Sequence, residues 1–409
     1  MLCSNAMAES GILPRSHRII VLRVGEVVIP SAATEGSDLV GGIFLNLPAP
    51  LAMPPHASIR YLLQFPRGAS QSFLLYSVLG DLVILAGDVG GTKCNLALFS
   101  EKGGRLTAVF RQRFRSKDFA TFDLIAKEFS RIAATYLGDK KIRAAGFGIA
   151  GPVINNRVRA TNLPWTVDAA VLSQELAIEH IILLNDLGAW GHSIEYLDPP
   201  DFAVLNLGSP EIGGTRALLA AGTGLGEAFL VWNGARYQVG ASEGGHSDFA
   251  PHTEQQIELL RFMRRRYPQV SFELILSGRG FRTIHEFLDP SVKHGAFADP
   301  DADPAPEITQ NGLNKTCPVC VRTIDLWTDI YGAEAGNLAL KVLALGGVYV
   351  AGGIAVKILE KMKDGAFFSS FKDKWHFEKL LQNIPVSVIL NENAPQLGAA
   401  YEALRLVQK

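Results

Sequence analysis

Three apolar segments of this sequence each run directly into a glycine-rich turn, and the turns cover residues 87–92, 221–226 and 351–353. Glycine has no Cβ and adopts positive φ easily, so the N–H groups of such a turn can point into one concavity that binds phosphate oxygens. A single turn of this kind is equally typical of a simple hairpin. Three of them, with Asp88 in the first and Thr223 in the second, predict a fold built around a phosphate-bearing ligand.

The residues around these turns exclude two common phosphate-binding motifs. A dinucleotide fingerprint requires a helix directly after its glycines, whereas residues 95–99 and 228–232 have the composition of strands. A P-loop requires a glycine, four further residues and then Gly-Lys followed by Ser or Thr, and the Gly-Gly-Thr-Lys of residues 90–93 does not match it. The turns are therefore predicted to form hairpins between strands.

The hydrophobic pattern indicates two copies of one α/β unit. Phe122, Ile125 and Phe129 recur at steps of three and four, which is one face of a helix, whereas shorter apolar runs are typical of strands. A second copy begins near Arg216, about 130 residues after the first, which is the spacing of a domain duplication. The first copy is expected to contain strands at 83–86, 95–99, 106–114, 144–149 and 181–184, and helices at 122–136 and at 167–176 with Thr166 as N-cap.

The later part of the chain is predicted to be mainly helical. Residues 289–316 are rich in proline, aspartate, asparagine and glycine, and we expect them to form a long surface loop. The expected helices span 257–266, 274–288, 321–345, 354–362 and 396–407, and the expected strands span 348–350 and 386–390.

The pattern also predicts a division into domains. Residues 1–81 are interrupted by prolines and show no sustained hydrophobic period, so we expect a poorly ordered extension. The remainder divides into a smaller α/β lobe, residues 82–196 with 391–409, and a larger lobe, residues 197–390. Hinges are expected near residues 196–200 and near residue 390, where the chain returns to the smaller lobe.

Charge and cysteine content argue against several classes of function. Thirty-nine basic and 40 acidic side chains leave a net charge of −1, which argues against a general nucleic-acid or membrane-surface binder. Four cysteines in 409 residues are too few for a disulfide scaffold, so a reducing, cytoplasmic location is expected. No uncharged apolar run reaches the length of about 18 residues that a membrane span needs.

Taken in order, the motifs of this chain resemble those of the actin-like sugar kinases and, more narrowly, those of the bacterial glucokinase family. The resemblance extends over about four-fifths of the chain, from residue 82 to the end. Each motif alone is weak, but their combination in this order is highly specific. The matching segments are residues 85–92 (LAGDVGGT), 148–153 (GIAGPV), 161–165 (TNLPW), 184–187 (LNDL), 221–226 (AGTGLG), 243–251 (EGGHSDFAP), 276–278 (LSG) and 351–354 (AGGI).

The resemblance implies a two-lobed actin-like α/β fold, of the ribonuclease H-like type, with a duplicated βββαβα core. It implies an enzyme that transfers the γ-phosphate of ATP to the 6-hydroxyl of glucose, the entry step of glycolysis, with Mg²⁺ as cofactor and a homodimer as the assembly. The residues expected to bind the nucleotide are Gly87, Asp88, Val89, Gly90, Gly91 and Thr92 in the first turn, Gly222, Thr223 and Gly224 in the second, and Gly352 and Gly353 in the third.

A hexose site needs carboxylates and amides, because each sugar hydroxyl both donates and accepts hydrogen bonds. The resemblance implies that such side chains bind glucose here. They are Asn185, Asp186, Glu243, His246 and Glu273, with Asn162 as a weaker candidate.

Asp186 is the candidate catalytic base. It follows the apolar run 181–184, at a strand end where α/β proteins place ligands. The residues alone leave a second interpretation equally open, in which Asp186 is the N-cap of a helix; the resemblance favours the base.

Asp88 is expected to orient water around Mg²⁺, which takes few protein ligands. Lys93 departs from the asparagine common in similar glucokinases and is expected to be a solvated turn residue.

Cys317 and Cys320 form a close pair that invites a metal interpretation. A tetrahedral zinc site needs two more ligands at suitable spacing, and none follows the pair. We therefore expect the pair to begin a helix and to bind no metal. The basic cluster of Arg261 and residues 264–266 is expected to be a solvated helix end rather than a nucleic-acid patch.

Other functions stay open at this point. One is a kinase for another hexose, such as mannose, glucosamine or an N-acetylated sugar. A sugar-sensing regulator of the same fold would be expected to carry a DNA-binding module or to lack the catalytic carboxylates. An actin-like or chaperone-like ATPase would lack the polar residues at 185–186 and 243–246. The phosphoryl donor is open too, since use of ADP or polyphosphate would leave no motif to read.

Overall fold

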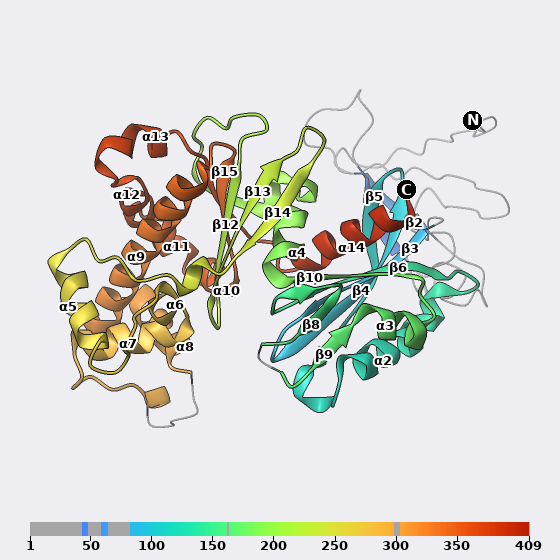
Figure 1. Cartoon of the computed structure of the whole chain (residues 1–409), viewed down its shortest axis with the longest axis horizontal. Coiled ribbons are helices and arrows are strands. Elements are labelled where there is room, and N and C mark those ends of the chain that lie inside the picture. Colours follow the sequence, from blue (N-terminus) through green and yellow to red (C-terminus); the bar gives the residue numbers. More distant parts are fainter. Residues whose placement is uncertain (1–42, 48–58, 64–81, 162, 298–302, 409) are drawn as a thin grey trace, which may run out of the picture. The chain divides into compact units, whose positions relative to one another are not determined.

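The computed structural model describes residues 43–47, 59–63, 82–161, 163–297 and 303–408 (Figure 1). The chain forms two compact units, Met1–Ser77 and Val78–Lys409. In the first unit, β1 (Ile43–Leu47) pairs antiparallel with β2 (Ile59–Leu63), a strand pair that the sequence pattern did not predict. The rest of the expected extension lies outside the described residues.

The first sheet of the second unit has five strands in the order β10-β6-β3-β4-β5. Its central strand β3 pairs antiparallel with β4 and parallel with β6, and β10 pairs parallel with β6. The strands span Leu82–Val89 (β3), Lys93–Lys102 (β4), Arg105–Arg115 (β5), Ile142–Ile149 (β6) and His180–Asn185 (β10). A three-stranded sheet of β7 (Val153–Ile154), β8 (Arg157–Arg159) and β9 (Thr166–Asp168) follows β6 in the chain.

Helices cover both faces of this first sheet (Figure 1). On one face α2 (Phe122–Leu137) and α3 (Ala169–Leu176) pack against one set of alternate strand residues, and Phe122, Ile125 and Phe129 are buried as their spacing predicted. On the other face α14 (Ala394–Val407) covers the remaining alternate residues of β3 and β6. Because both faces are covered, the inner strands β3 and β6 are almost completely buried and read as nearly continuous apolar runs.

The second sheet repeats the strand order of the first. Its spatial order is β11-β16-β15-β12-β13-β14. Strands β16, β15, β12, β13 and β14 take the places that β10, β6, β3, β4 and β5 have in the first sheet, with the same parallel and antiparallel pairings. Strand β11 is added at one edge and pairs with β16. This repetition confirms the expected duplicated core. The strands span Phe202–Asn206 (β11), Arg216–Ala221 (β12), Leu225–Trp232 (β13), Tyr237–Ser242 (β14), Gly347–Ala351 (β15) and Val386–Ile389 (β16).

Helix α4 (Asp186–Ser193) contacts strands of both sheets and also α14. The contact with α14 is close because a Cβ at Gly398 would lie 1.9 Å from the Ala189 carbonyl oxygen, which only glycine avoids. Leu187 on the same helix packs with Leu218 and Leu230 of the second sheet. The first residue of α4 therefore lies between strands of both sheets.

The remaining helices lie in the part of the chain between β14 and β16. They are α5 (Glu254–Met263), α6 (Phe272–Ile275), α7 (Gly278–Leu288), α8 (Ala305–Leu313), α9 (Pro318–Val342), α10 (Gly353–Lys357), α11 (Leu359–Lys363), α12 (Ala366–Lys372) and α13 (Glu378–Gln382). Among the described residues, no helix combines the length and the apolar character needed to cross a membrane.

Four sequence expectations about helices and loops were wrong in detail. The helix expected at 167–176 begins only at Ala169, because residues 166–168 form β9 and Asp168 is the N-cap, accepting a hydrogen bond from the Ala170 N–H. The helices expected at 274–288 and 354–362 are each two shorter helices. The loop expected at 289–316 contains α8, whose buried Ile308 and Thr309 were too few to reveal it within a polar segment.

Candidate active site

Two cavities lie beside the second glycine turn, and both are lined by Gly222 and Thr223. The smaller has a volume of about 360 Å³ and also includes Gly90 and Gly91 of the first turn. The larger has a volume of about 790 Å³ and is formed by helices α7, α8 and α10. The second glycine turn thus borders both cavities, whereas the first borders only the smaller one.

The smaller cavity brings together most of the side chains expected to bind sugar. Asn185, Asp186, Glu243, His246 and Glu273 all line it. These residues come from the end of β10, the start of α4, the segment after β14, and α6. Asn162, the remaining candidate, lies outside the described residues.

Asp186 is the first residue of α4, and the helix N-cap is Asn185. The alternative interpretation of Asp186 as the N-cap is therefore wrong, although one of its carboxylate oxygens, Oδ1, accepts a hydrogen bond of 3.0 Å from the Leu187 N–H. Burial raises the pKa of Asp186 above its ordinary value, the backbone hydrogen bond opposes this, and the nearby negative charge of Glu243 adds to the rise. A carboxylate with a raised pKa is a stronger proton acceptor than an ordinary aspartate.

Asn185 is held in place by the protein itself. Its Oδ1 accepts hydrogen bonds from the N–H groups of Leu187, at 3.0 Å, and Gly188, at 3.4 Å. Its Nδ2 donates to the carbonyl oxygen of Gly151 at 3.2 Å. An amide nitrogen carries two hydrogens, so one N–H remains free to reach a ligand in the cavity.

Glu273 is anchored to the second glycine turn. Its Oε2 accepts a hydrogen bond of 3.1 Å from the Leu225 N–H and lies 4.0 Å from Nε2 of His246, while Oε1 lies 3.9 Å from Nη2 of Arg279. A Cβ at Gly224 would lie 2.3 Å from the same carboxylate. The turn therefore needs glycine at this position to leave room for Glu273.

The first turn places Asp88 at the end of β3, beneath the lining residues Gly90 and Gly91. The Asn95 side chain donates a hydrogen bond of 3.3 Å to Asp88. Burial raises the pKa of Asp88 to about 6, Asn95 opposes the rise, and the charge of Asp186 adds to it. Gly87, Asp88, Val89 and Thr92 do not line either cavity, so of the first turn only the two glycines reach the cavity surface.

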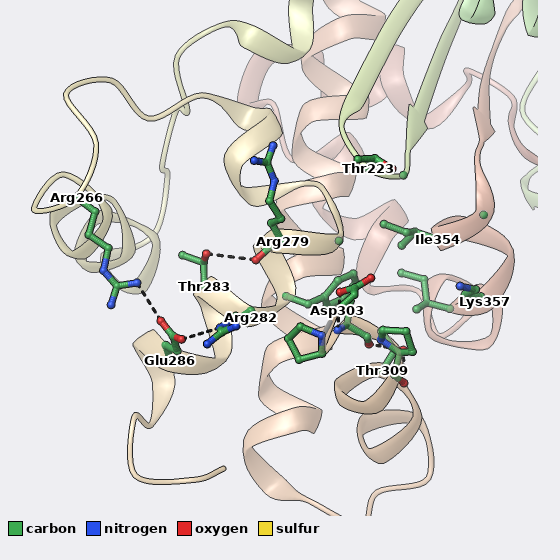
Figure 2. Close-up of a pocket in the computed structure, with 18 of the residues that line it drawn as sticks. Thr223, Arg266, Arg279, Arg282, Thr283, Glu286, Asp303, Thr309, Ile354 and Lys357 are labelled. Atoms are coloured by element: carbon green, nitrogen blue, oxygen red, sulfur yellow. Dashed lines mark hydrogen bonds and ion pairs between the residues drawn. The ribbon is translucent and has the colours of Figure 1, made fainter. Parts of the chain in front are cut away.

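The larger cavity has a polar wall that the sequence motifs did not reveal. Figure 2 shows Arg279, Arg282 and Thr283 of α7 on one side and Ile354 and Lys357 of α10 on the other. The expected adenosine-turn residue Gly353 lines this cavity, whereas Gly352 lines the smaller one. On the α7 side, Glu286 accepts hydrogen bonds from Arg282 at 3.0 Å and from Arg266 at 2.9 Å.

A buried carboxyl pair next to the segment that carries Glu243 and His246 was also missed by the motif analysis. Glu227 on β13 is 2% exposed and Glu334 on α9 is completely buried. Glu334 is hydrogen-bonded by the side chains of Asn337, at 2.8 Å, and Lys341, at 3.2 Å. Burial raises the pKa of Glu227 to about 8, and the charge of Glu334 adds to the rise. No local sequence signal could have found this pair, because its members are far apart in the chain.

Glu227→Gln is expected to make the protein more resistant to heat in alkaline buffer. The folded-state pKa of Glu227 is raised, so its favourable contribution is present at low pH and is lost as the pH rises through about 8. Glutamine is neutral at every pH, so the variant does not lose stability through ionisation of this side chain. Melting temperatures measured across this range should fall less steeply for the variant, and parallel curves for the two proteins would contradict the expectation.

Comparisons with known proteins agree on one family. A sequence profile of the family described as Glucokinase matches residues 85–406. A glucokinase of Nostoc punctiforme is 38% identical over 343 residues, which cover 79% of this chain and 99% of the relative. Among solved structures, a glucokinase from an Antarctic psychrotroph superposes with a TM-score of 0.69 at 27% identity, over 79% of this chain and 99% of that one. The glucokinase of Balamuthia mandrillaris in complex with glucose has a TM-score of 0.67 at 20% identity, over 79% and 94%.

Proposed function

This chain belongs to the glucokinase family, and we propose that its two cavities hold glucose and ATP on opposite sides of the second glycine turn. The protein is a hexose kinase that transfers the γ-phosphate of ATP to the 6-hydroxyl of glucose. The main support for this arrangement is that the smaller and the larger cavity are both lined by Gly222 and Thr223. A phosphate chain lying on this turn would have its terminal group facing Asp186.

In the smaller cavity, Glu243 and Glu273 accept hydrogen bonds from glucose hydroxyls, His246 forms a further hydrogen bond, and the free N–H of Asn185 donates one. Carboxylates suit this task because each can accept hydrogen bonds from two neighbouring hydroxyls. The ligand would displace water from a site that already contains several acidic groups. The cavity of about 360 Å³ has room for a single hexose ring.

Asp186 accepts the proton of the 6-hydroxyl as that oxygen attacks the γ-phosphorus. Its raised pKa improves it as a base, and the Leu187 N–H fixes the carboxylate orientation. A strong base is not required, because phosphoryl transfer has a loose transition state in which positioning and charge neutralisation dominate. The N–H groups of the two glycine turns would supply part of that neutralisation.

The residues present also fit a hydrated Mg²⁺. Asp88 and Asp186 are close enough that the charge of Asp186 raises the pKa of Asp88, and the Asn95 side chain donates a hydrogen bond of 3.3 Å to the Asp88 carboxylate. Asp88 would hold the ion through water, and the ion would neutralise phosphate charge when bound. Thr223 lines both cavities and would donate a hydrogen bond to a phosphate oxygen, and Gly353 borders the larger cavity, where the adenosine would lie. Thr92, expected to do the same, lines neither cavity and would need the lobes to close to reach the phosphates.

The lobe boundaries, assembly and location are part of the same proposal. The lobes are residues 82–196 with 391–409 and residues 197–390, and they close on the sugar so that water is excluded from the γ-phosphate. The protein acts as a homodimer in the cytoplasm. Sedimentation of the purified chain tests the dimer, and small-angle scattering with and without glucose tests the closure.

A coupled assay of the full chain tests the function directly. Glucose 6-phosphate formation would be measured with MgATP, and then with ADP or polyphosphate in place of ATP. Glucose would next be replaced by mannose, glucosamine and N-acetylglucosamine. We expect glucose with MgATP to give the highest kcat/KM. A higher value for another sugar would reassign the substrate, and no turnover with any sugar would reject the kinase function.

Glu273→Gln and Glu243→Gln are expected to raise the KM for glucose by about tenfold each, because each loses a charged hydrogen-bond acceptor. The KM for ATP should change little, since neither carboxylate lines the larger cavity. Glu254→Gln, at an exposed glutamate on α5, is the matched control. Initial rates measured over both substrates check this, and an equal rise in both KM values would mean that the two glutamates do not specifically serve the sugar.

A further inference from the structure

Two histidines and two cysteines converge in the helical region, away from the glycine turns. The ligand atoms of His285, His294, Cys317 and Cys320 all lie within 4.8 Å of one another. His285 is on α7, His294 lies just before the short helix at residues 295–297, and the two cysteines lie at the N-cap and in the first turn of α9. The expectation that the cysteine pair lacks further ligands was wrong, because the two histidines precede it in the chain.

The buried histidine of this cluster has unused ring nitrogens. His285 is completely buried, and neither Nδ1 nor Nε2 has a hydrogen-bond partner. A buried polar atom without a partner costs on the order of 1–3 kcal/mol, so proteins normally satisfy such atoms. A ligand within the cluster would satisfy one of these nitrogens.

The other members are already directed toward a common point. Nε2 of His294 lies 3.1 Å from the Cys320 sulfur, and Nδ1 of the same ring lies 3.5 Å from Nδ2 of Asn311, on the other side. Cys320 is completely buried, and Cys317 and Cys320 are not joined in a disulfide. The ring of His294 is therefore oriented with one nitrogen toward the thiols.

From this geometry we infer that His285, His294, Cys317 and Cys320 bind one structural zinc ion. Two sulfur and two imidazole ligands are a typical donor set for tetrahedral zinc. With Zn–S distances of about 2.3 Å and Zn–N distances of about 2.0 Å, the donor atoms of a tetrahedron lie roughly 3.3–3.8 Å apart. The observed limit of 4.8 Å needs only small side-chain movements to reach this.

The zinc ion would fix one wall of the larger cavity. It would join α7, the segment around His294 and the start of α9 at one point, and α7 also carries Arg279, Arg282 and Thr283, which line that cavity. The Arg282 guanidinium lies over the ring of Phe297, 5.3 Å from its centroid, next to the cluster. Metal loss should therefore loosen the cavity wall as well as lower the thermal stability.

Metal analysis of the full chain, purified in reducing buffer from zinc-supplemented cells, tests the site. We expect about one zinc ion per chain when the protein's metal content is measured by inductively coupled plasma mass spectrometry. Replacing zinc with cobalt should give the intense visible absorption of a tetrahedral thiolate site. Cys317→Ser and His294→Gln change partly exposed residues and should lose most of the zinc while keeping the wild-type circular dichroism spectrum. Cys94→Ala and His252→Gln, outside the cluster, should retain the metal.

Two results would overturn the inference. One is a wild-type protein that neither carries zinc nor takes it up against a chromogenic chelator while both thiols titrate as free. The other is zinc that persists in both the Cys317 and the His294 variant, which would place the metal elsewhere. Chelator-stripped protein should melt several degrees lower and recover with zinc. The stripped protein should also have a higher KM for ATP. Of the results expected here, only this one depends on the proposed function being correct.

Discussion

Replacing Asp186 with alanine is expected to lower kcat by roughly 10²–10⁴-fold, the contribution of a positioned general base. The side chain lies at the start of α4 in the smaller cavity, and its pKa is raised by burial. Without it, the 6-hydroxyl must lose its proton to water, and the sugar oxygen is no longer aligned with the γ-phosphorus. Glucose binding should persist, because Glu243, His246 and Glu273 remain.

Binding and turnover can be measured separately for this variant. Trp190 lies on α4 and lines the same cavity, so its fluorescence should report glucose binding without chemistry. Asp186→Asn keeps the shape and should be nearly as inactive as the alanine variant. Asp168→Asn changes an aspartate that likewise stands between a strand and a helix but caps α3, and it should have wild-type kcat. Near-normal turnover in either Asp186 variant would show that another group takes the proton.

Most strands of the two sheets were predictable because their signals are local, whereas β11 and β14 of the second sheet were not predicted. Each strand that ends in a glycine turn is a short apolar run, and the turn chemistry follows directly in the sequence, so the duplicated order could be read before any contact was known. The N-cap next to Asp186, the proposed catalytic base, was harder to assign. Asn185 and Asp186 are both good capping residues, and only the backbone geometry shows that Asn185 caps the helix.

The features that were missed depend on contacts between distant segments. Glu227 and Glu334 meet only when β13 packs against α9, and His285 reaches Cys320 only when α7 lies beside α9. The polar wall of the larger cavity has the same origin, because the motifs at residues 276–278 and 351–354 end before Arg279 and Lys357, the polar side chains of α7 and α10 that line it. A search for metal ligands confined to the residues after Cys320 could not have found histidines that precede it.

Asp88→Asn is expected to lower kcat by roughly 10–100-fold and at the same time to raise the melting temperature of the ligand-free protein. The activity falls because a neutral amide holds the hydration shell of Mg²⁺ less well than a carboxylate, and loss of an outer-shell partner typically costs this much. The stability rises because Asp88 is largely desolvated and faces the charge of Asp186, so its ionised form is unfavourable in the folded state.

The pH dependence separates this explanation from a simple loss of packing. Because the pKa of Asp88 is raised to about 6, its favourable contribution to stability is present at low pH and is lost as the pH rises through that value. The gain in melting temperature from asparagine should therefore be clear at about pH 8 and small at about pH 5. Asp139→Asn, at an exposed position just after α2, should change neither stability nor kcat. A variant that is both less active and less stable at alkaline pH would show that Asp88 supports the fold rather than the ion, and the proposed role in holding Mg²⁺ would have to be given up.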